Sequence, residues 1–305
     1  MIRGLGLVLS LCFLPTWSAQ EPPAGQQAKP EMERLVLDDM EDVSDWYNGS
    51  PIETKISADT AHVKEGRRAL KFANRVDHTQ GEKNYPIGWP RTGKDLARKG
   101  PLTDWTGYDF FECWIYADTN REKLPDTPLN VGFYHSGPKR STSFRLKEVR
   151  KGTWRHIVIP IEKLAAPADV RRVQFNISES NYKHGDRVDF WIDDMVLTRY
   201  RHPVIGQLEP VRRLLYTNER VIRVTYALQG FRGDRPMPAV LQVGRDAQSA
   251  VQTVRASLQQ RGELALRLQK PLPAGTYRVE LTLTDADGHV LDRKETSFRV
   301  IDGPF

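Results

Sequence analysis

Hydrophobic residues along the chain gather in short runs that turn residues separate, with little helical spacing between them. The runs are rich in β-branched and aromatic residues, and several alternate apolar with polar positions, as strands do when one face of a sheet is buried. In the first two thirds of the chain the runs lie at 35–37, 69–72, 110–116, 129–134, 157–159, 173–177 and 188–197. This spacing predicts an all-β fold that begins with a jelly-roll β-sandwich over residues 35–200.

A second series of strands is expected after His202, where the composition also changes. Every tryptophan beyond Trp17 lies ahead of this series. The runs lie at 220–228, 239–243, 263–268, 277–284 and 290–300, and Asp287-Gly288 predicts a hairpin turn between the last two. We therefore expect a second, immunoglobulin- or fibronectin-III-like β-sandwich over residues 201–305, joined to the first near Pro203.

The N-terminus has the pattern of a secretory signal peptide. Arg3 is followed by an apolar stretch at 5–14 and then by small residues up to Ala19. Residues 1–19 are therefore expected to be a cleaved signal peptide and 20–34 a disordered leader rich in Pro, Gln, Ala and Gly. A lipid anchor on Cys12 is a weaker alternative, because Leu11 occupies the position where a small residue is expected. The mature chain is expected to be secreted, periplasmic or at the cell surface, with no membrane span.

The charge balance argues against a dedicated nucleic-acid binder. The 305 residues include 45 Lys and Arg and 39 Asp and Glu, a formal net charge of +6, with both signs interleaved and no long basic run. A mild preference for anionic partners is compatible with this excess.

Several residues are core candidates rather than site candidates. Cys113 is the one cysteine beyond Cys12, so no intramolecular disulfide is expected in the mature chain, and its place in an apolar strand predicts a buried thiol. Four tryptophans in apolar strand contexts are also predicted to be core: Trp105, Trp114, Trp154 and Trp191.

An ordered set of motifs gives the first part of the chain a family resemblance. Leu35-Val-Leu-Asp-Asp-Met-Glu41 is followed by Asp45-Trp46, and further motifs lie at 63–72, 104–116, 152–160 and 188–197. Over about 35–200 this order resembles the galactose-binding-like jelly rolls found as carbohydrate-binding modules of secreted bacterial glycan-degrading proteins. The resemblance implies a polysaccharide or glycan as partner.

The resemblance also implies a structural calcium ion. The carboxylates of the first and last strands would be neighbours in a jelly roll, and calcium prefers such oxygen ligands. Backbone oxygens around 61–66 could complete the shell. The alternative is a group of solvated carboxylates paired with Lys64 or Arg67. The metal candidates are Glu41 and Asp194, with Asp39 and Asp193 as alternates.

Strand alternation predicts a polar sheet face that could bind a sugar. Val131 and Phe133 would face the core, as would the apolar residues of 173–177, and the residues between them would point outward. Amide and hydroxyl groups beside an aromatic ring suit the hydroxyls and the apolar face of a sugar. An ordinary solvated face is the alternative. The candidates are Asn130, Tyr134, Gln174 and Asn176, flanked by His135 and Arg145.

The long loop at 75–100 offers a second set of ligand contacts. Tyr85, Trp89 and Arg91 lie in it, and loops of this length are often functional. Trp89, between glycine and proline, could be a stacking platform, and Arg91 could contact a carboxylate or sulfate of an acidic glycan. Alternatively, Trp89 packs into the core and fixes the loop.

No motif in the sequence assigns a catalytic activity. A Gly-x-Ser-x-Gly elbow, a His-Glu-x-x-His helix and a phosphate-binding loop are absent. Glu112 and the Asp193 region do not have the pattern of a glycosidase acid/base pair. We therefore expect an exported, non-catalytic carbohydrate-binding protein. The alternatives are a structural or protein-interaction module of the cell envelope and, less favoured, a polysaccharide lyase-like enzyme.

Overall fold

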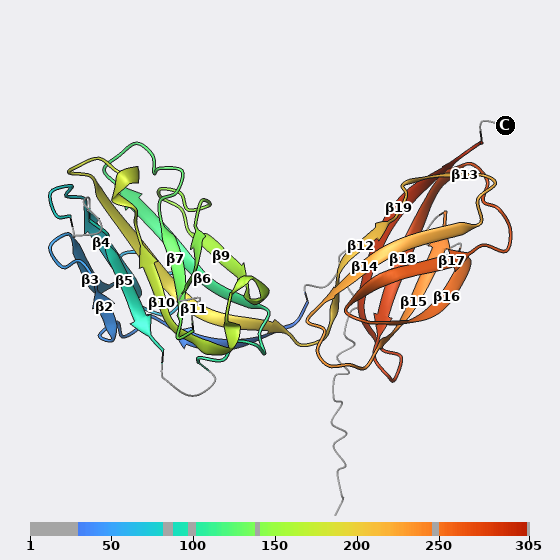
Figure 1. Cartoon of the computed structure of the whole chain (residues 1–305), viewed down its shortest axis with the longest axis horizontal. Helices are drawn as coiled ribbons and strands as arrows, with labels where there is room; N and C mark the ends of the chain where they lie inside the picture. Colours follow the sequence, from blue (N-terminus) through green and yellow to red (C-terminus); the bar gives the residue numbers. More distant parts are fainter. Residues whose placement is uncertain (1–29, 82–87, 97–101, 138–140, 246–249, 304–305) are drawn as a thin grey trace, which may run out of the picture.

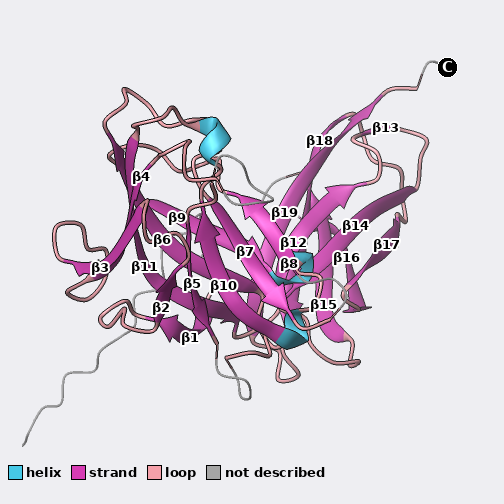
Figure 2. Ribbon diagram, turned by 60° about the vertical axis from the view of Figure 1, so that its left-hand side comes forward, coloured by secondary structure: helices cyan, strands magenta, loops and turns pink. Residues whose placement is uncertain are grey.

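The computed structural model of the chain describes residues 30–81, 88–96, 102–137, 141–245 and 250–303. Within these residues the backbone forms β-strands and three 3-10 helices of three residues each, so the predicted all-β fold is confirmed. The strands form two pairs of sheets, which we name the N-terminal and the C-terminal sandwich (Figures 1 and 2). No helix within the described ranges has the length and apolar character needed to cross a membrane.

The N-terminal sandwich consists of two mainly antiparallel sheets. The first sheet has the strand order β3 (Thr54–Asp59), β4 (Ala69–Arg75), β11 (Arg187–Tyr200), β6 (Phe110–Thr119) and β9 (Arg155–Pro160), and β1 (Met32–Asp38) also pairs with β11. The second sheet has the order β2 (Trp46–Asn48), β5 (Arg91–Asp95), β10 (Val170–Asn176), β7 (Asn130–His135) and β8 (Ser141–Arg145). In both sheets, strands that are far apart in the sequence are thus neighbours.

Alternating apolar residues of the two sheets meet in one hydrophobic cluster. Trp105 is fully buried there, with its ring centroid 5.7 Å from that of Phe111 and 5.4 Å from that of Phe133. Cys113 is fully buried in the same cluster, and burial raises the pKa of its thiol far above the ordinary value. The thiol is therefore a packed core group, as the sequence predicts.

The C-terminal sandwich has its own hydrophobic cluster, from Ile205 to Val300, which shares no residue with the first. One sheet has the strand order β12 (Val204–Pro210), β14 (Val221–Gln229) and β17 (Arg261–Arg267). The other has the order β13 (Leu214–Tyr216), β19 (Val290–Ile301), β18 (Gly275–Thr284), β15 (Met237–Gly244) and β16 (Ala250–Leu258). β18 and β19 pair as the predicted hairpin, and Gly288 in its turn has a φ of 88°.

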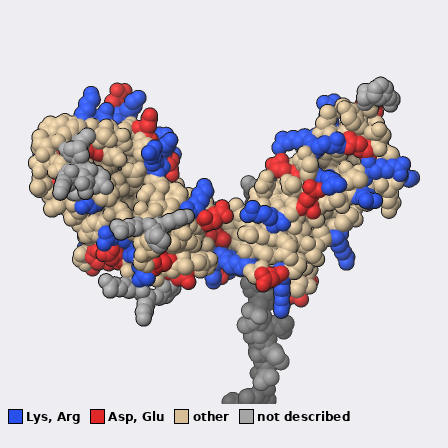
Figure 3. All heavy atoms as spheres, in the orientation of Figure 1, with Lys and Arg blue, Asp and Glu red and all other residues tan. Residues whose placement is uncertain are grey.

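On one face of the molecule the surface charges have the interleaved pattern that the sequence predicts. On the face drawn in Figure 3, basic and acidic side chains lie among one another over both sandwiches. No single-sign patch of the kind that binds nucleic acid dominates this face.

Candidate functional site

The candidate site is the outer face of the second sheet of the N-terminal sandwich. Residues of β10 that point to the core, such as Val173 and Phe175, alternate with residues that point outward. The pairing register places the outward residues in three rows across the strands, which we name the polar face. The rows are Arg91, Asn176, Asn130 and Arg145; Tyr47, Gly93, Gln174, Gly132 and Ser143; and Asp95, Arg172, Tyr134 and Ser141.

Two glycines let two tyrosine rings lie close against the sheet. A Cβ atom at Gly93 would come within 2.8 Å of the Tyr47 ring and 2.7 Å of the Val173 carbonyl oxygen. A Cβ atom at Gly132 would come within 3.3 Å of the Tyr134 ring. Any larger residue at Gly93 would therefore displace the ring of Tyr47, and the polar face is built around two half-buried aromatic side chains.

Gln174 lies between the two tyrosines and fixes them. The Tyr47 hydroxyl donates to Gln174 Oε1, and Gln174 Nε2 donates to the Tyr134 hydroxyl at 2.9 Å. Gln174 itself is only 3% exposed. It was predicted as a ligand contact, but the structure gives it the role of holding the rings from beneath.

Arg172 completes the aromatic part of the polar face. Its guanidinium carbon lies 4.8 Å from the centroid of the Tyr47 ring and 5.9 Å from that of Tyr134. Asp95 accepts hydrogen bonds from Arg172 Nε at 2.5 Å and Nη2 at 3.2 Å, which raises the pKa of Arg172. Burial raises the pKa of Tyr47, so this hydroxyl stays neutral at neutral pH. The face therefore combines a fixed cation with neutral hydroxyls.

The row on the other side of the tyrosines is polar and basic. Asn130 Nδ2 donates to the backbone carbonyl of Asn176 at 3.4 Å, and no described residue hydrogen-bonds the side-chain amide of Asn176. Arg145 is exposed and forms no ion pair with any described residue. Arg91 and Arg145 lie at opposite ends of this row.

Trp89 lies at the edge of this row, next to β5. It is half-buried and belongs to neither hydrophobic cluster of the described residues. The Arg91 guanidinium lies 4.7 Å from the centroid of its ring, and Arg91 Nη1 donates to its carbonyl at 3.0 Å. Trp89 is thus held at the rim of the polar face and does not pack in the core.

Two residues that were predicted as ligand contacts are not among the residues of the polar face. His135 is 6% exposed, shares the inward side of β7 with Val131 and Phe133, and its Nε2 lies 3.3 Å from Thr142 Oγ1. The expectation that it flanks the outer face is wrong, because strand alternation turns it inward. Tyr85 lies outside the described residues.

The predicted metal ligands divide into two groups. Asp193 is fully buried; its Oδ2 accepts from the backbone amides of Lys64 at 2.7 Å and Glu65 at 3.1 Å, while no described residue hydrogen-bonds its Oδ1. Burial raises the pKa of this carboxyl, and the charges of Glu65 and, less, Glu41 add to the effect. An orphaned buried carboxylate oxygen such as Asp193 Oδ1 is the kind of ligand that a hard cation takes.

Asp39 and Asp194 lie apart from this arrangement. Asp194 has a φ of 54° and forms an ion pair with Arg34, and the Asp39 carboxylate accepts a hydrogen bond from the Glu41 amide at 3.2 Å. Glu41 accepts from the backbone amides of Arg67 and Arg68, and its Oε2 lies 3.6 Å from Arg67 Nε, so the alternative of a carboxylate paired with Arg67 holds for Glu41. Asp193 is therefore the candidate with an oxygen left for a cation, rather than Asp194, and Glu41 is the nearby carboxylate whose charge acts on it.

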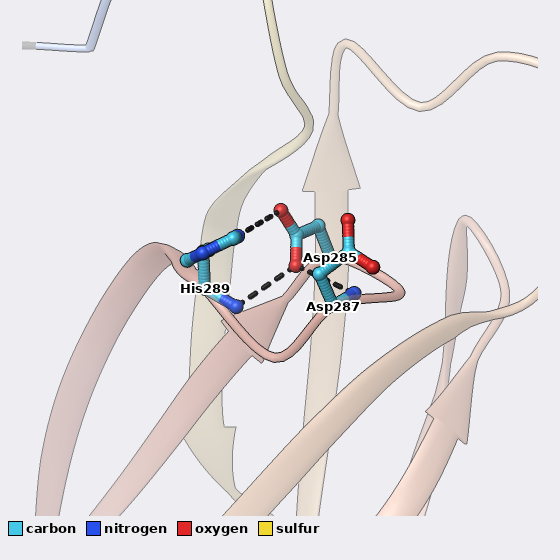
Figure 4. A group of neighbouring side chains, drawn as sticks. All are labelled: Asp285, Asp287 and His289. Carbon is cyan, nitrogen blue, oxygen red and sulfur yellow. Dashed lines mark hydrogen bonds and ion pairs between the residues drawn. The ribbon is translucent and has the colours of Figure 1, made fainter.

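A third group of candidate ligands lies in the C-terminal sandwich. Asp285, Asp287 and His289 cluster in the β18–β19 turn (Figure 4). Asp285 Oδ1 accepts from the amides of Asp287 at 2.9 Å and His289 at 2.8 Å, and Asp285 Oδ2 lies 3.0 Å from His289 Nδ1. These bonds form the turn itself, so the cluster has a structural role without a metal.

The opposite sheet of the N-terminal sandwich carries tryptophans that were predicted to be core. Trp114 and Tyr116 alternate with the buried Cys113 and Ile115 and lie on the outer side of β6. Trp191 pairs with Tyr116 across the strands and is covered by His62, whose ring centroid lies 4.4 Å away. With Trp154 they form an outer aromatic layer, in which Trp191 is nevertheless buried, at 4% exposure. Burial is thus confirmed for Trp105 and Trp191, and of the four only Trp105 belongs to the hydrophobic cluster of the described residues.

Comparisons with known proteins return structural neighbours only. No protein-family model matches the chain, and no curated protein sequence does. A β-1,2-glucanase from Parabacteroides distasonis is 12% identical with a TM-score of 0.36, over 85% of this chain and 37% of that one. This chain thus spans about a third of that enzyme's length.

Two further neighbours contain carbohydrate-binding modules. A non-crystalline cellulose specific module, CBM28, is 13% identical with a TM-score of 0.35, over 55% of this chain and 96% of that one. A xylanase from Clostridium thermocellum with its CBM22-1 module, complexed with xylohexaose, is 18% identical with a TM-score of 0.32. The match covers 56% of this chain and 28% of that one. These values are too low to assign the chain to a family.

Proposed function

We propose that the chain is an exported, non-catalytic carbohydrate-binding protein whose polar face binds a polysaccharide. The observation that carries this proposal is the pair of tyrosine rings, Tyr47 and Tyr134, which glycines and Gln174 hold against the sheet. Aromatic rings fixed before binding lose little conformational freedom when a ligand stacks on them. The N-terminal sandwich would then be a galactose-binding-like jelly roll, and residues 1–19 its export signal.

The chemistry around the rings suits a sugar. The apolar C–H face of a pyranose can lie on an aromatic ring, while its hydroxyls need donors and acceptors nearby. Asn130, Asn176 and Ser143 supply such groups on the same face. Arg91, Arg145 and Arg172 outnumber the one carboxylate of Asp95, which favours a glycan that carries carboxylate or sulfate groups.

Affinity gel electrophoresis tests this proposal. The mature chain would be run through native gels that contain neutral β-glucans, xylans, or uronate-containing polymers. We expect at least one polysaccharide to retard the chain, with acidic polymers retarding it more at low salt than at high salt. Migration that no polysaccharide changes would favour the structural or protein-interaction alternative instead.

Trp89 is expected to contribute to binding more than to stability. Because it lies at the rim of the polar face and outside both hydrophobic clusters, Trp89→Ala should weaken glycan retention by about fivefold, equivalent to about 1 kcal/mol for one aromatic contact. Thermal unfolding should change little. Severe destabilisation with retention preserved would show that Trp89 is a structural residue.

We propose that Glu41 and Asp193 bind a structural calcium ion in the N-terminal sandwich. A metal bound only by the native state raises the melting temperature by mass action. Millimolar calcium should therefore raise the melting temperature relative to excess chelator, and Glu41→Gln should remove most of that response. Identical melting of the wild-type chain in chelator and in calcium would refute this site.

A further inference from the structure

Two further carboxylates, on segments other than those of Glu41 and Asp193, are buried in the N-terminal sandwich. Glu53 lies in the turn before β3, and Glu179 is the first residue of a 3-10 helix, Glu179–Asn181. Glu179 is only 1% exposed and Glu53 only 6%. Neither carboxylate oxygen of Glu179 has a hydrogen-bond partner among the described residues. A buried acidic group in this state is rare, because losing water without gaining a partner is costly.

The two side chains converge on one point beside Gly88. A Cβ atom built there would lie 2.6 Å from Glu179 Oε2 and 3.0 Å from Glu53 Oε2. Gly88 has a φ of 84°, so the backbone conformation also favours glycine. The Asp77 amide donates to the other oxygen, Glu53 Oε1, at 3.2 Å and orients that carboxylate. One oxygen from each glutamate thus faces the same small space.

Among the described residues, no basic side chain compensates this pair. Neither carboxylate forms an ion pair with a described Lys, Arg or His, and the nearby His78 ring approaches the Glu179 backbone carbonyl instead, at 3.4 Å. Burial and the adjacent Glu53 raise the pKa of Glu179 to about 9. Two neighbouring carboxylates in a buried site require either a shared proton or a bound cation.

We propose that Glu53 and Glu179 bind a divalent cation, and that this cation is calcium. Both side chains offer oxygen ligands, which select hard cations over zinc or copper. The pair is almost fully buried, so few waters can complete the shell. Magnesium usually keeps several waters, whereas calcium accepts carboxylates and backbone carbonyls around it.

The cation would connect segments that lie far apart in the sequence. The turn that contains Glu53 also contains Ser50, whose Oγ donates to the Trp89 carbonyl at 3.1 Å. The 3-10 helix that begins at Glu179 follows β10, whose last residue, Asn176, is on the polar face. Calcium at this point would therefore fix the Trp89 end of the polar face. The proposed site does not depend on glycan binding.

Calorimetric titration of the metal-free chain with calcium chloride tests the site. Glu179→Gln and Glu53→Gln keep the side-chain shape and remove one charge, and each should bind one equivalent of calcium fewer than the wild-type chain. Glu162→Gln, at an exposed glutamate without ion-pair partners in the described structure, is the matched control and should bind as the wild-type chain does. Glu41→Gln should remove a different equivalent and leave this one.

Equal calcium stoichiometry in the wild-type chain, Glu179→Gln and Glu53→Gln would overturn the proposal and indicate a shared proton instead. If both variants fail to fold, wild-type crystals grown in calcium give the answer. A metal peak about 2.3–2.6 Å from oxygens of both glutamates supports the site, and density without a metal there overturns it.

Discussion

The double variant Tyr47→Ala, Tyr134→Ala is expected to lose nearly all retardation by a polysaccharide that retards the wild-type chain. Each ring should contribute about 1 kcal/mol of binding free energy, so losing both should weaken binding by roughly thirtyfold. The measurement is affinity electrophoresis over a range of polysaccharide concentrations, which gives a dissociation constant for each variant.

Two controls separate ring stacking from other effects. The double variant Tyr47→Phe, Tyr134→Phe keeps both rings but removes the hydroxyls that bond Gln174, and it should retain most of the binding. Tyr216→Ala removes a tyrosine that is 39% exposed in the C-terminal sandwich and should bind as the wild-type chain does. Undiminished binding by the alanine pair would show that the polar face is not the glycan site.

Trp105→Ala is expected to destabilise the N-terminal sandwich by about 3–5 kcal/mol, the usual cost of deleting a buried tryptophan. The side chain is fully buried, stacks on Phe111, and donates from Nε1 to the Leu102 carbonyl at 2.8 Å. Urea unfolding followed by tryptophan fluorescence measures the stability of this sandwich, because every tryptophan beyond Trp17 lies between residues 46 and 191.

Trp114→Ala provides the matched comparison. Trp114 lies in the outer aromatic layer, where its ring stacks on His156 with centroids 4.6 Å apart. Its removal leaves no internal cavity, so the loss should be about 1 kcal/mol or less. Equal losses for the two variants would contradict the assignment of Trp105 to the core and of Trp114 to the outer layer.

Strand alternation predicted the part of the polar face on β7 and β10, because it depends only on neighbours in the sequence. It placed Asn130 and Tyr134 on one side of their strand and Asn176 outward on another, where the structure also has them. The same rule, applied strictly, would have turned His135 inward with Val131 and Phe133. Tyr47 was missed because its strand has only three residues, too few to show an alternation.

Other features depend on long-range pairing that a single sequence does not reveal. The register of β11 against β6 shifts between Asp193 and Val196, and this irregularity sends Asp194 toward Arg34 while Asp193 stays buried. Gln174 is hidden because Tyr47, from 127 residues away, closes over it. The buried pair of Glu53 and Glu179 is brought together in the same way.

The proposed function is tested most directly by a crystal structure of the chain with a bound oligosaccharide. The oligosaccharide would come from the polysaccharide that retards the chain most strongly. We expect a sugar ring on the polar face, stacked on Tyr47 or Tyr134 and within hydrogen-bond distance of Asn130 or Asn176. A sugar bound instead on the outer aromatic layer of Trp114 and Trp191, or on the C-terminal sandwich, would contradict the account.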